Sequence, residues 1–228
     1  MKAKKYLNLN DYELFVFDCD GVLLDSNSLK SQAFRLTLDK YPKELVDDFI
    51  SYHEINGGIS RHVKFEYFLS NILKITNYQK EYKSLLKRFS KVSMNLIISE
   101  AEFIPGIKDL LKIIHKKNKH AIVCSGTDEI DLQNILALKE IDHYFSHIYG
   151  SPKTKKDILS KILCTFQSNS IKGIFFGDAL SDYEAAIKFG FDFIFVSHNS
   201  DWSNISQTPN YKNLSFVRSF EDLQVMES

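Results

Sequence analysis

Residues 14–26 read LFVFDCDGVLLDS, and this stretch decides the fold. The apolar run 14–17 is followed by Asp18, Cys19, Asp20 and Gly21. An unbroken apolar run of this length predicts a strand buried on both faces, as in a parallel sheet. Residues two apart in extended backbone point the same way, so Asp18 and Asp20 should converge on one site. The alternative is a strand that simply runs into an acidic turn, and the rest of the chain decides between the two.

Composition sets the broad class. The chain has 228 residues, of which 44% are hydrophobic, and Lys+Arg and Asp+Glu are both 29. This is enough for one sizeable core, or a core plus a smaller lobe. The zero net charge favours neither nucleic acid nor an anionic membrane as a partner, and no apolar run approaches the length of a membrane span. We therefore expect a small-molecule partner and a protein that is a monomer or a homodimer.

The cysteines indicate the compartment. Cys19, Cys124 and Cys164 are odd in number and show no metal-ligand spacing. Such cysteines fit a reducing compartment, so we expect a cytoplasmic protein.

Apolar segments and helical segments alternate through most of the chain. After 14–17, further strands are expected at 120–124, 147–149, 172–176 and 193–196, with a short strand near Phe216 and a helix from Glu221. Residues 27–100 show only the 3.6-residue period of helices. The pattern predicts a doubly wound parallel α/β core, made of residues 1–26 and 101–228. Residues 27–100 are expected to form an inserted α-helical cap over the carboxyl edge of the sheet.

Polar side chains follow several of the expected strands. Ser125 follows the strand at 120–124, and Asp178 and Asp182 follow the strand at 172–176. Lysines open the helix after Gly150, at Lys153, Lys155 and Lys156. Carboxylates gathered at one edge repel each other unless a hard cation lies among them, and Mg²⁺ prefers such oxygen ligands together with substrate phosphate. A lysine and a serine hydroxyl beside it would bind a phosphoryl group. The pattern predicts a phosphoryl-transfer site in which one carboxylate can be the nucleophile.

These residues resemble four ordered motifs of the haloacid dehalogenase superfamily of phosphohydrolases. DCDGVLLDS resembles motif I, IVCSGT motif II, GSPKTKKDIL motif III and GDALSDYEAAIKFG motif IV. The resemblance extends from Phe15 to about Val196. The helical segment resembles the small cap of the branch that includes phosphoglycolate phosphatases and β-phosphoglucomutases.

The resemblance implies a role for each residue of motif I. Asp18 would be the nucleophile and a Mg²⁺ ligand. Asp20 would be the general acid and then the base, and its backbone carbonyl would bind Mg²⁺. An acid needs a raised pKa, which we expect a closed, desolvated site to supply. The presence of Asp20 also argues against a dehalogenase, because that branch lacks an acid/base Asp here.

The other motifs complete the implied site. Ser125 and the N–H of Gly126 would bind the phosphoryl oxygens. Lys155 is chosen as the motif lysine over Lys153 and Lys156 because its spacing to Leu159 resembles the Lys-x-x-x-Leu helix start of the family. This lysine would offset the charge of Asp18 and the phosphate. Asp178 would be a Mg²⁺ ligand, and Asp182 a ligand directly or through water.

Residues 57–61 of the expected cap read GGISR and resemble the Gly-x-Ser-Arg stretch of sugar-phosphate phosphatases and β-phosphoglucomutase-like enzymes. Arg61 would reach into the cleft and bind a substrate phosphate or carboxylate, or else lie solvated beside a helix-joining loop. Lys30, just past motif I, is a weaker candidate for substrate binding. His53 and His62 either line the cleft or pack at the surface.

The sequence thus predicts a Mg²⁺-dependent phosphatase that hydrolyses a small phosphorylated metabolite, such as a sugar phosphate, through an aspartyl-phosphate. One alternative is a phosphomutase of the β-phosphoglucomutase type, which the Gly-x-Ser-Arg stretch supports. Lys30 stands where such mutases carry a histidine. The other alternative is a binding module that kept the fold and lost turnover, against which all the motif carboxylates are present.

Overall fold

In the computed structural model, residues 5–166, 171–208 and 214–226 are described. Six parallel strands form one sheet, in the order β4-β3-β2-β5-β6-β7. Their bounds are β2 Leu14–Phe17, β3 His120–Asp128, β4 His147–Ser151, β5 Gly173–Gly177, β6 Asp192–Val196 and β7 Ser215–Val217. The apolar run of residues 14–17 is therefore a central strand, paired with β3 on one side and β5 on the other.

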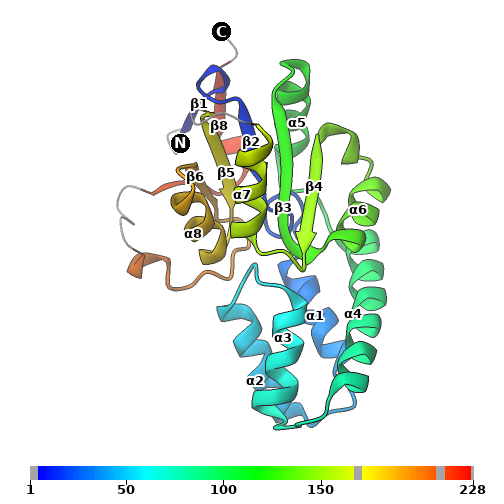
Figure 1. The fold of residues 1–228 in the computed structure, drawn as a ribbon. Coiled ribbons are helices and arrows are strands. Elements are labelled where there is room, and N and C mark those ends of the chain that lie inside the picture. The colour runs from blue at the N-terminus through cyan, green and yellow to red at the C-terminus, as the bar shows by residue number, and fades with distance from the viewer. Residues whose placement is uncertain (1–4, 167–170, 209–213, 227–228) are drawn as a thin grey trace.

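Helices cover both faces of this sheet (Figure 1). They are α5 Ile107–Lys116, α6 Glu129–Leu138, α7 Lys155–Thr165 and α8 Leu180–Lys188. Alternate residues of β2 enter different cores: Phe15 and Phe17 pack with α5 and α6, whereas Leu14 and Val16 pack with α7 and α8. Every side chain of β2 is buried, as a strand covered on both faces requires. The predicted doubly wound α/β fold is confirmed.

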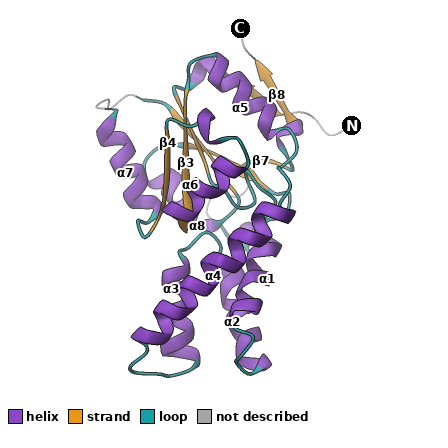
Figure 2. Cartoon of the chain, turned by 90° about the vertical axis from the view of Figure 1, so that its right-hand side faces the viewer, coloured by secondary structure: helices purple, strands orange, loops and turns teal. Residues whose placement is uncertain are grey.

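Residues 27–100 form a bundle of helices beside the sheet, as Figure 2 shows. They form α1 Asn27–Thr37, α2 Lys43–Ile55, α3 Arg61–Tyr67, which continues as a π-helical turn, and α4 Gln79–Glu100. Their apolar faces meet in a core of their own that contains Phe34, Phe49, Phe65 and Phe89. This helical bundle lies against the carboxyl edge of the sheet (Figure 1).

The end of the chain departs from the sequence prediction. The short strand near Phe216 is present as β7. The helix expected from Glu221 is wrong, because Phe220–Asp222 form a single 3₁₀ turn and β8, Leu223–Met226, follows at once. β8 pairs in parallel with β1, Lys5–Asn8, in a two-stranded sheet. The pairing joins segments more than 200 residues apart, so local periodicity does not indicate it.

No described helix has the length and apolar character needed to cross a bilayer.

Candidate active site

The site lies where β2 ends, between β3 and β5. From β2 the chain first adds β3 and β4 on one side and then β5, β6 and β7 on the other, so the strand order reverses at β2. Open α/β sheets bind their ligands at such a switch point. Asp18 directly follows β2, and its backbone N–H donates to the carbonyl of Phe176 at 3.0 Å, which extends the pairing with β5 by one residue. Asp178 follows β5 in the same way. The two carboxylates therefore meet because two adjacent parallel strands end together.

Three buried carboxylates gather there. Oxygen atoms of Asp18, Asp178 and Asp182 lie within 4.8 Å of one another. Asp182 is held by its place in the first turn of α8, where its Oδ2 accepts from the N–H of Ala179 at 3.1 Å. Lys155, at the start of α7, is also buried and donates to Asp18 at 2.7 Å and to Asp182. One lysine thus serves two of three clustered acids.

The pKa values of this cluster are shifted by burial and by the repulsion between its carboxylates. Burial raises the pKa of Asp178 well above its usual range, and the charges of Asp18 and Asp182 raise it further. Burial raises the pKa of Asp182 to about 7, although the Lys155 ammonium opposes the rise. The pKa of Lys155 is raised despite its burial, because Asp18 and Asp182 stabilise its charge. Oxygen donors that repel one another in this way fit a hard divalent cation such as Mg²⁺.

Lys155 differs from the two other candidates for the motif lysine. Lys153 is exposed and lies 3.4 Å from Glu129, and Lys156 forms a partly exposed ion pair with Glu184. Neither contacts the carboxylate cluster. The structure brings Lys155 alone of the three to Asp18.

Asp20 has a different environment from the carboxylate cluster. Its carboxylate accepts from the hydroxyls of Ser26 at 2.6 Å and Thr127 at 2.8 Å, and it lies 3.1 Å from the Nζ of Lys30. Burial would raise the pKa of Asp20, but Lys30 and these two hydrogen bonds outweigh it, so the pKa lies below its usual value. The expectation that desolvation raises this pKa is therefore wrong in this structure. Lys30 supplies the opposing charge.

Residues 125–127, in the last part of β3, were expected to bind phosphoryl oxygens. Ser125 is buried, and its Oγ accepts from the N–H of Thr127 at 3.2 Å. The glycine between them is packed against the helical bundle: a Cβ built on Gly126 would lie 2.3 Å from the carbonyl oxygen of Gly58. The loop of residues 57–61 therefore lies directly against residues 125–127 of β3. A second contact joins the same loop to α8, where Ser181 Oγ donates to the carbonyl of Gly57 at 3.2 Å.

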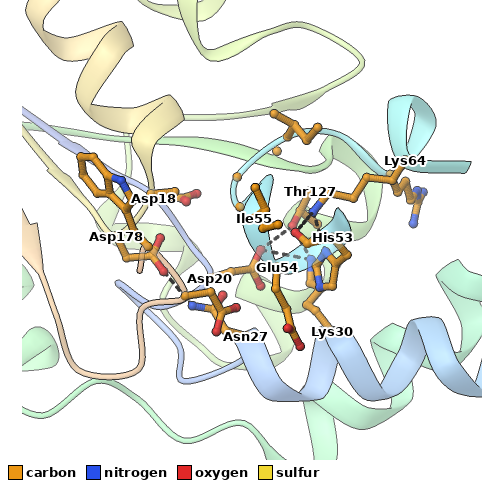
Figure 3. A pocket seen from close by; sticks show the side chains of 18 of the residues that line it. Asp18, Asp20, Asn27, Lys30, His53, Glu54, Ile55, Lys64, Thr127 and Asp178 are labelled. Carbon is orange, nitrogen blue, oxygen red and sulfur yellow. Dashed lines mark hydrogen bonds and ion pairs between the residues drawn. The ribbon is translucent and has the colours of Figure 1, made fainter. Parts of the chain in front are cut away.

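A cavity of about 170 Å³ lies between the sheet edge and the helical bundle. Figure 3 shows Asp18 and Asp178 on one side of it and His53 and Lys64 on the other, with Asp20 between them. Asp18, Asp20, Lys30, Arg61, Gly126 and Asp178 line it, whereas Ser125, Lys155 and Asp182 lie behind the lining. A ligand in this cavity would touch both parts of the chain.

Arg61 lines the cavity but is bound to core carboxylates. Its guanidinium lies 2.5 Å from Asp131 and 3.2 Å from Asp128. Ser90 of α4 donates to the same Asp131 at 2.6 Å. The arginine is therefore not solvated: it joins the helical bundle to β3 and α6 through two of its nitrogens, while its Nε is buried without a hydrogen-bond partner among the described residues. His62 lies beside it, 3.8 Å from Asp128.

Several lining residues escaped the sequence analysis. Asn27 donates to Asp178 at 2.7 Å, and Lys30 donates to Thr127 at 2.6 Å. The loop after β6 closes one side of the cavity with Asp201–Asn204. Asn27 directly follows motif I and Thr127 is the last residue of motif II, so their positions could have indicated them. The loop after β6 carries no such signal, because only the fold returns it to the site.

Known proteins resemble this chain in sequence and in fold. The fold and its edge of clustered carboxylates define a doubly wound α/β protein with an acidic, lysine-bearing site. The family model for haloacid dehalogenase-like hydrolases matches residues 15–196, and the chain belongs to that family. The resemblance predicted from the four motifs is confirmed.

Individual relatives are distant. A phosphorylated carbohydrates phosphatase of Thermotoga maritima is 23% identical over 188 residues, which are 80% of this chain and 84% of the relative. CbbY of Rhodobacter sphaeroides, solved in complex with phosphate, shares the fold with a TM-score of 0.75 at 17% identity, covering 94% of this chain and 97% of CbbY. β-Phosphoglucomutase of Clostridium difficile has a TM-score of 0.71 at 20% identity and covers 93% of both chains.

Proposed function

We propose that the protein is a Mg²⁺-dependent phosphatase that hydrolyses a small phosphomonoester, such as a sugar phosphate, through an aspartyl-phosphate at Asp18. The observation that carries this proposal is the buried group of Asp18, Asp178 and Asp182 with Lys155 at the end of β2. The family, the phosphorylated carbohydrates phosphatase of Thermotoga maritima and the phosphate complex of CbbY support it.

The metal and phosphate positions follow from the donors. Asp18, Asp178, Asp182 and the backbone carbonyl of Asp20 would hold Mg²⁺, which when bound supplies positive charge to the transferring phosphoryl group. Lys155 donates to Asp18 at 2.7 Å and holds its carboxylate in place. Ser125 and the N–H of Gly126 would bind the phosphoryl oxygens.

The residues of the chain perform two successive displacements. A carboxylate oxygen of Asp18 attacks phosphorus, the bond from phosphorus to the ester oxygen breaks, and protonated Asp20 gives its proton to the departing alcohol. Asp20, now a carboxylate, then removes a proton from water, the water oxygen attacks phosphorus, and the bond from phosphorus to Asp18 breaks. Phosphate leaves, and both aspartates regain their starting states.

The pKa of Asp20 in the substrate-free site is low, which favours its carboxylate form. For the first step, the incoming dianionic phosphate must raise this pKa, as a neighbouring like charge does. Lys30 is placed to govern both states through its contact with Asp20.

We further propose that residues 27–100 act as a cap that closes over residues 1–26 and 101–228. The contacts of Arg61 and Gly57 with the core support a closed arrangement, and closure excludes water from the reacting groups. The proposed site needs no second chain, because its residues come from one chain. We therefore propose a protein that acts as a monomer or a homodimer.

The test is release of inorganic phosphate from a panel of sugar phosphates, 2-phosphoglycolate and nucleotides, with and without Mg²⁺. We expect release that needs Mg²⁺ and falls by about 1,000-fold or more in Asp18→Asn. Hydrolysis that survives in the variant would overturn the proposal. Turnover only in the presence of a sugar bisphosphate primer would instead identify a phosphomutase, and no turnover on any compound would favour a binding module.

A further inference from the structure

Three cationic side chains line the cavity, and one of them has no acidic partner. Lys30 lies beside Asp20, and Arg61 lies between Asp128 and Asp131. Lys64 also lines the cavity, but no carboxylate among the described residues forms an ion pair with it. A buried lysine without a paired acid is costly. Lys64 is therefore the cation of this site whose charge is not yet accounted for.

Lys64 is buried beside few hydrogen-bond acceptors. Only 3% of the residue is exposed. Its Nζ lies 2.5 Å from Nδ1 and 3.3 Å from the carbonyl oxygen of His53, and 5.9 Å from the ring centre of Phe34. Figure 3 shows the side chain extending from α3 toward His53. An ammonium has three donors, so an acceptor supplied by a ligand has a place.

His53 is a second hydrogen-bonding residue on the same side of the cavity. The residue is 8% exposed and lines the same cavity. When Lys64 is charged, its Nζ donates to Nδ1 and the ring proton lies on Nε2, an atom that is buried without a hydrogen-bond partner among the described residues. Buried polar groups in native proteins are nearly always hydrogen-bonded. An N–H without an acceptor and an ammonium without an acidic partner, on two residues that line the same cavity, indicate a place for an anion.

The titration behaviour of the pair agrees with this geometry. Burial lowers the pKa of Lys64 to about 7, and Lys30 lowers it further, while Asp20 and Asp201 oppose the shift. Burial also lowers the pKa of His53 to about 2, with Lys64 and Lys30 adding to the effect. The nearby acids do not fully offset the effect of burial on the charged ammonium. A bound anion would do so.

The position of the pair within the cavity assigns the part of the substrate that it would meet. Asp20 must reach the ester oxygen in the proposed reaction. Lys30 joins Asp20 to the helical bundle, and Lys64 and His53 lie on the bundle side of the cavity. The alcohol that leaves therefore extends from Asp20 toward Lys64. The phosphoryl group stays at the opposite side, beside Asp18.

On the basis of the proposed phosphatase function, we propose that Lys64 and His53 form a subsite for a second anionic group on the leaving alcohol. The substrate class is then a small phosphomonoester that also carries a carboxylate or a second phosphate. Two carboxylates already offset the charge of the Arg61 guanidinium, which leaves Lys64 as the lining cation without an ion-pair partner among the described residues. A carboxylate and a phosphate share the chemistry that the donors recognise, and the experiment separates them.

The experiment compares substrates that differ only in the second charge. One pair is 2-phosphoglycolate and ethyl phosphate, and the other is fructose 1,6-bisphosphate and fructose 1-phosphate. The ratio of kcat/KM within each pair is measured for the wild type, Lys64→Met, Lys64→Gln and Lys83→Met. Lys83 is an exposed lysine of α4 and serves as the matched control.

We expect the wild type and Lys83→Met to prefer the doubly anionic member of one pair by about 10- to 100-fold, the effect of a charged hydrogen bond. The pair that shows the preference identifies the anion as carboxylate or phosphate. Both Lys64 variants should lose the preference, mainly through KM. A preference that persists in both variants, or a wild type without preference in either pair, overturns the subsite.

Calorimetry with Asp18→Asn in the presence of Mg²⁺ measures the Kd of each substrate in the absence of turnover. The two members of a substrate pair should differ in Kd by the same factor as in kcat/KM. Adding Lys64→Met to Asp18→Asn should abolish this difference in Kd. If the wild type hydrolyses nothing but the binding ratio behaves as stated, the phosphatase proposal fails and the subsite stands. If hydrolysis needs Mg²⁺ and Asp18 but neither ratio depends on Lys64, the subsite fails alone.

Discussion

Replacing Lys64 by methionine tests the energetic consequence of a buried cation without an acidic partner. The side chains are similar in length, and methionine carries no charge and adapts readily to an apolar site. Lys64 packs beside Phe34 and is almost fully buried. We therefore expect Lys64→Met to be more stable than the wild type near neutral pH.

The size of the effect follows from the pKa of Lys64. Burial lowers that pKa from 10.5 to about 7 in the folded protein. Between these values the unfolded chain binds more protons than the folded one, so the free energy of unfolding of the wild type rises with pH. The difference of 3.5 pH units corresponds to about 5 kcal/mol in total. From pH 7 to pH 9, the expected rise is about 2 kcal/mol.

Urea unfolding at pH 7, 8 and 9, followed by circular dichroism, measures this difference. The stability advantage of Lys64→Met over the wild type should be greatest at pH 7 and shrink by about 2 kcal/mol at pH 9. Lys83→Met should differ from the wild type by a constant amount. An advantage of Lys64→Met that does not change with pH would refute the reasoning, because it would mean that Lys64 keeps its ordinary pKa.

Three further predictions concern the site itself. Mg²⁺ should raise the melting temperature by more at pH 8 than at pH 6, because the raised pKa of Asp178 makes protons compete with the cation; differential scanning fluorimetry measures this. Lys30→Met should move the acidic limb of the pH–rate profile upward by about one unit, because Lys30 holds the pKa of Asp20 down. Gly126→Ala should lower kcat by about 100-fold, because its Cβ would meet the carbonyl of Gly58 and keep the cap from closing.

Each of these has a matched control. Asp178→Asn should lose most of the Mg²⁺ effect on the melting temperature, and an undiminished effect would place the cation elsewhere. Lys153→Met, on the exposed side of the same region, should leave the pH profile in place. Gly57→Ala should be tolerated, because its Cβ would meet Ala179 at an ordinary 3.4 Å. Equal losses in Gly57→Ala and Gly126→Ala would argue against a steric block of closure.

The core of the fold was predictable because its signals are local. A strand buried on both faces, such as 14–17, is an unbroken apolar run, and polar residues follow it directly. Asp18 and Asp178 could be placed together because adjacent parallel strands end at one edge. The pairing of β1 with β8 was missed because it depends on segments at opposite ends of the chain. The helix expected from Glu221 was wrong for the same reason, since β8 forms only by pairing with β1.

The contacts between the two parts of the chain were the least predictable. The sequence left open whether Arg61 binds substrate or solvent, and in the structure it binds Asp128 and Asp131. Those residues lie on a different element, so spacing gives no indication of the contact. Lys64 offers a weak signal in retrospect, because it lies four residues before Phe68 on the apolar face of its helix. A charged residue on such a face is a candidate for a buried contact.

The pKa of Asp20 shows why site chemistry needs coordinates. Burial alone predicts a raised pKa, and the direction is reversed by one lysine from α1 and two hydroxyls. The residue types were visible in the sequence, but their distances to Asp20 were not.

Trapping the covalent intermediate tests the central proposal most directly. The protein is mixed with Mg²⁺ and its best substrate from the panel, quenched in acid and treated with borohydride, which reduces an aspartyl-phosphate to homoserine. Peptide mass spectrometry should then find homoserine at position 18 in a substrate-dependent amount, and nothing in Asp18→Asn. Phosphate release with an unmodified Asp18 would contradict the account.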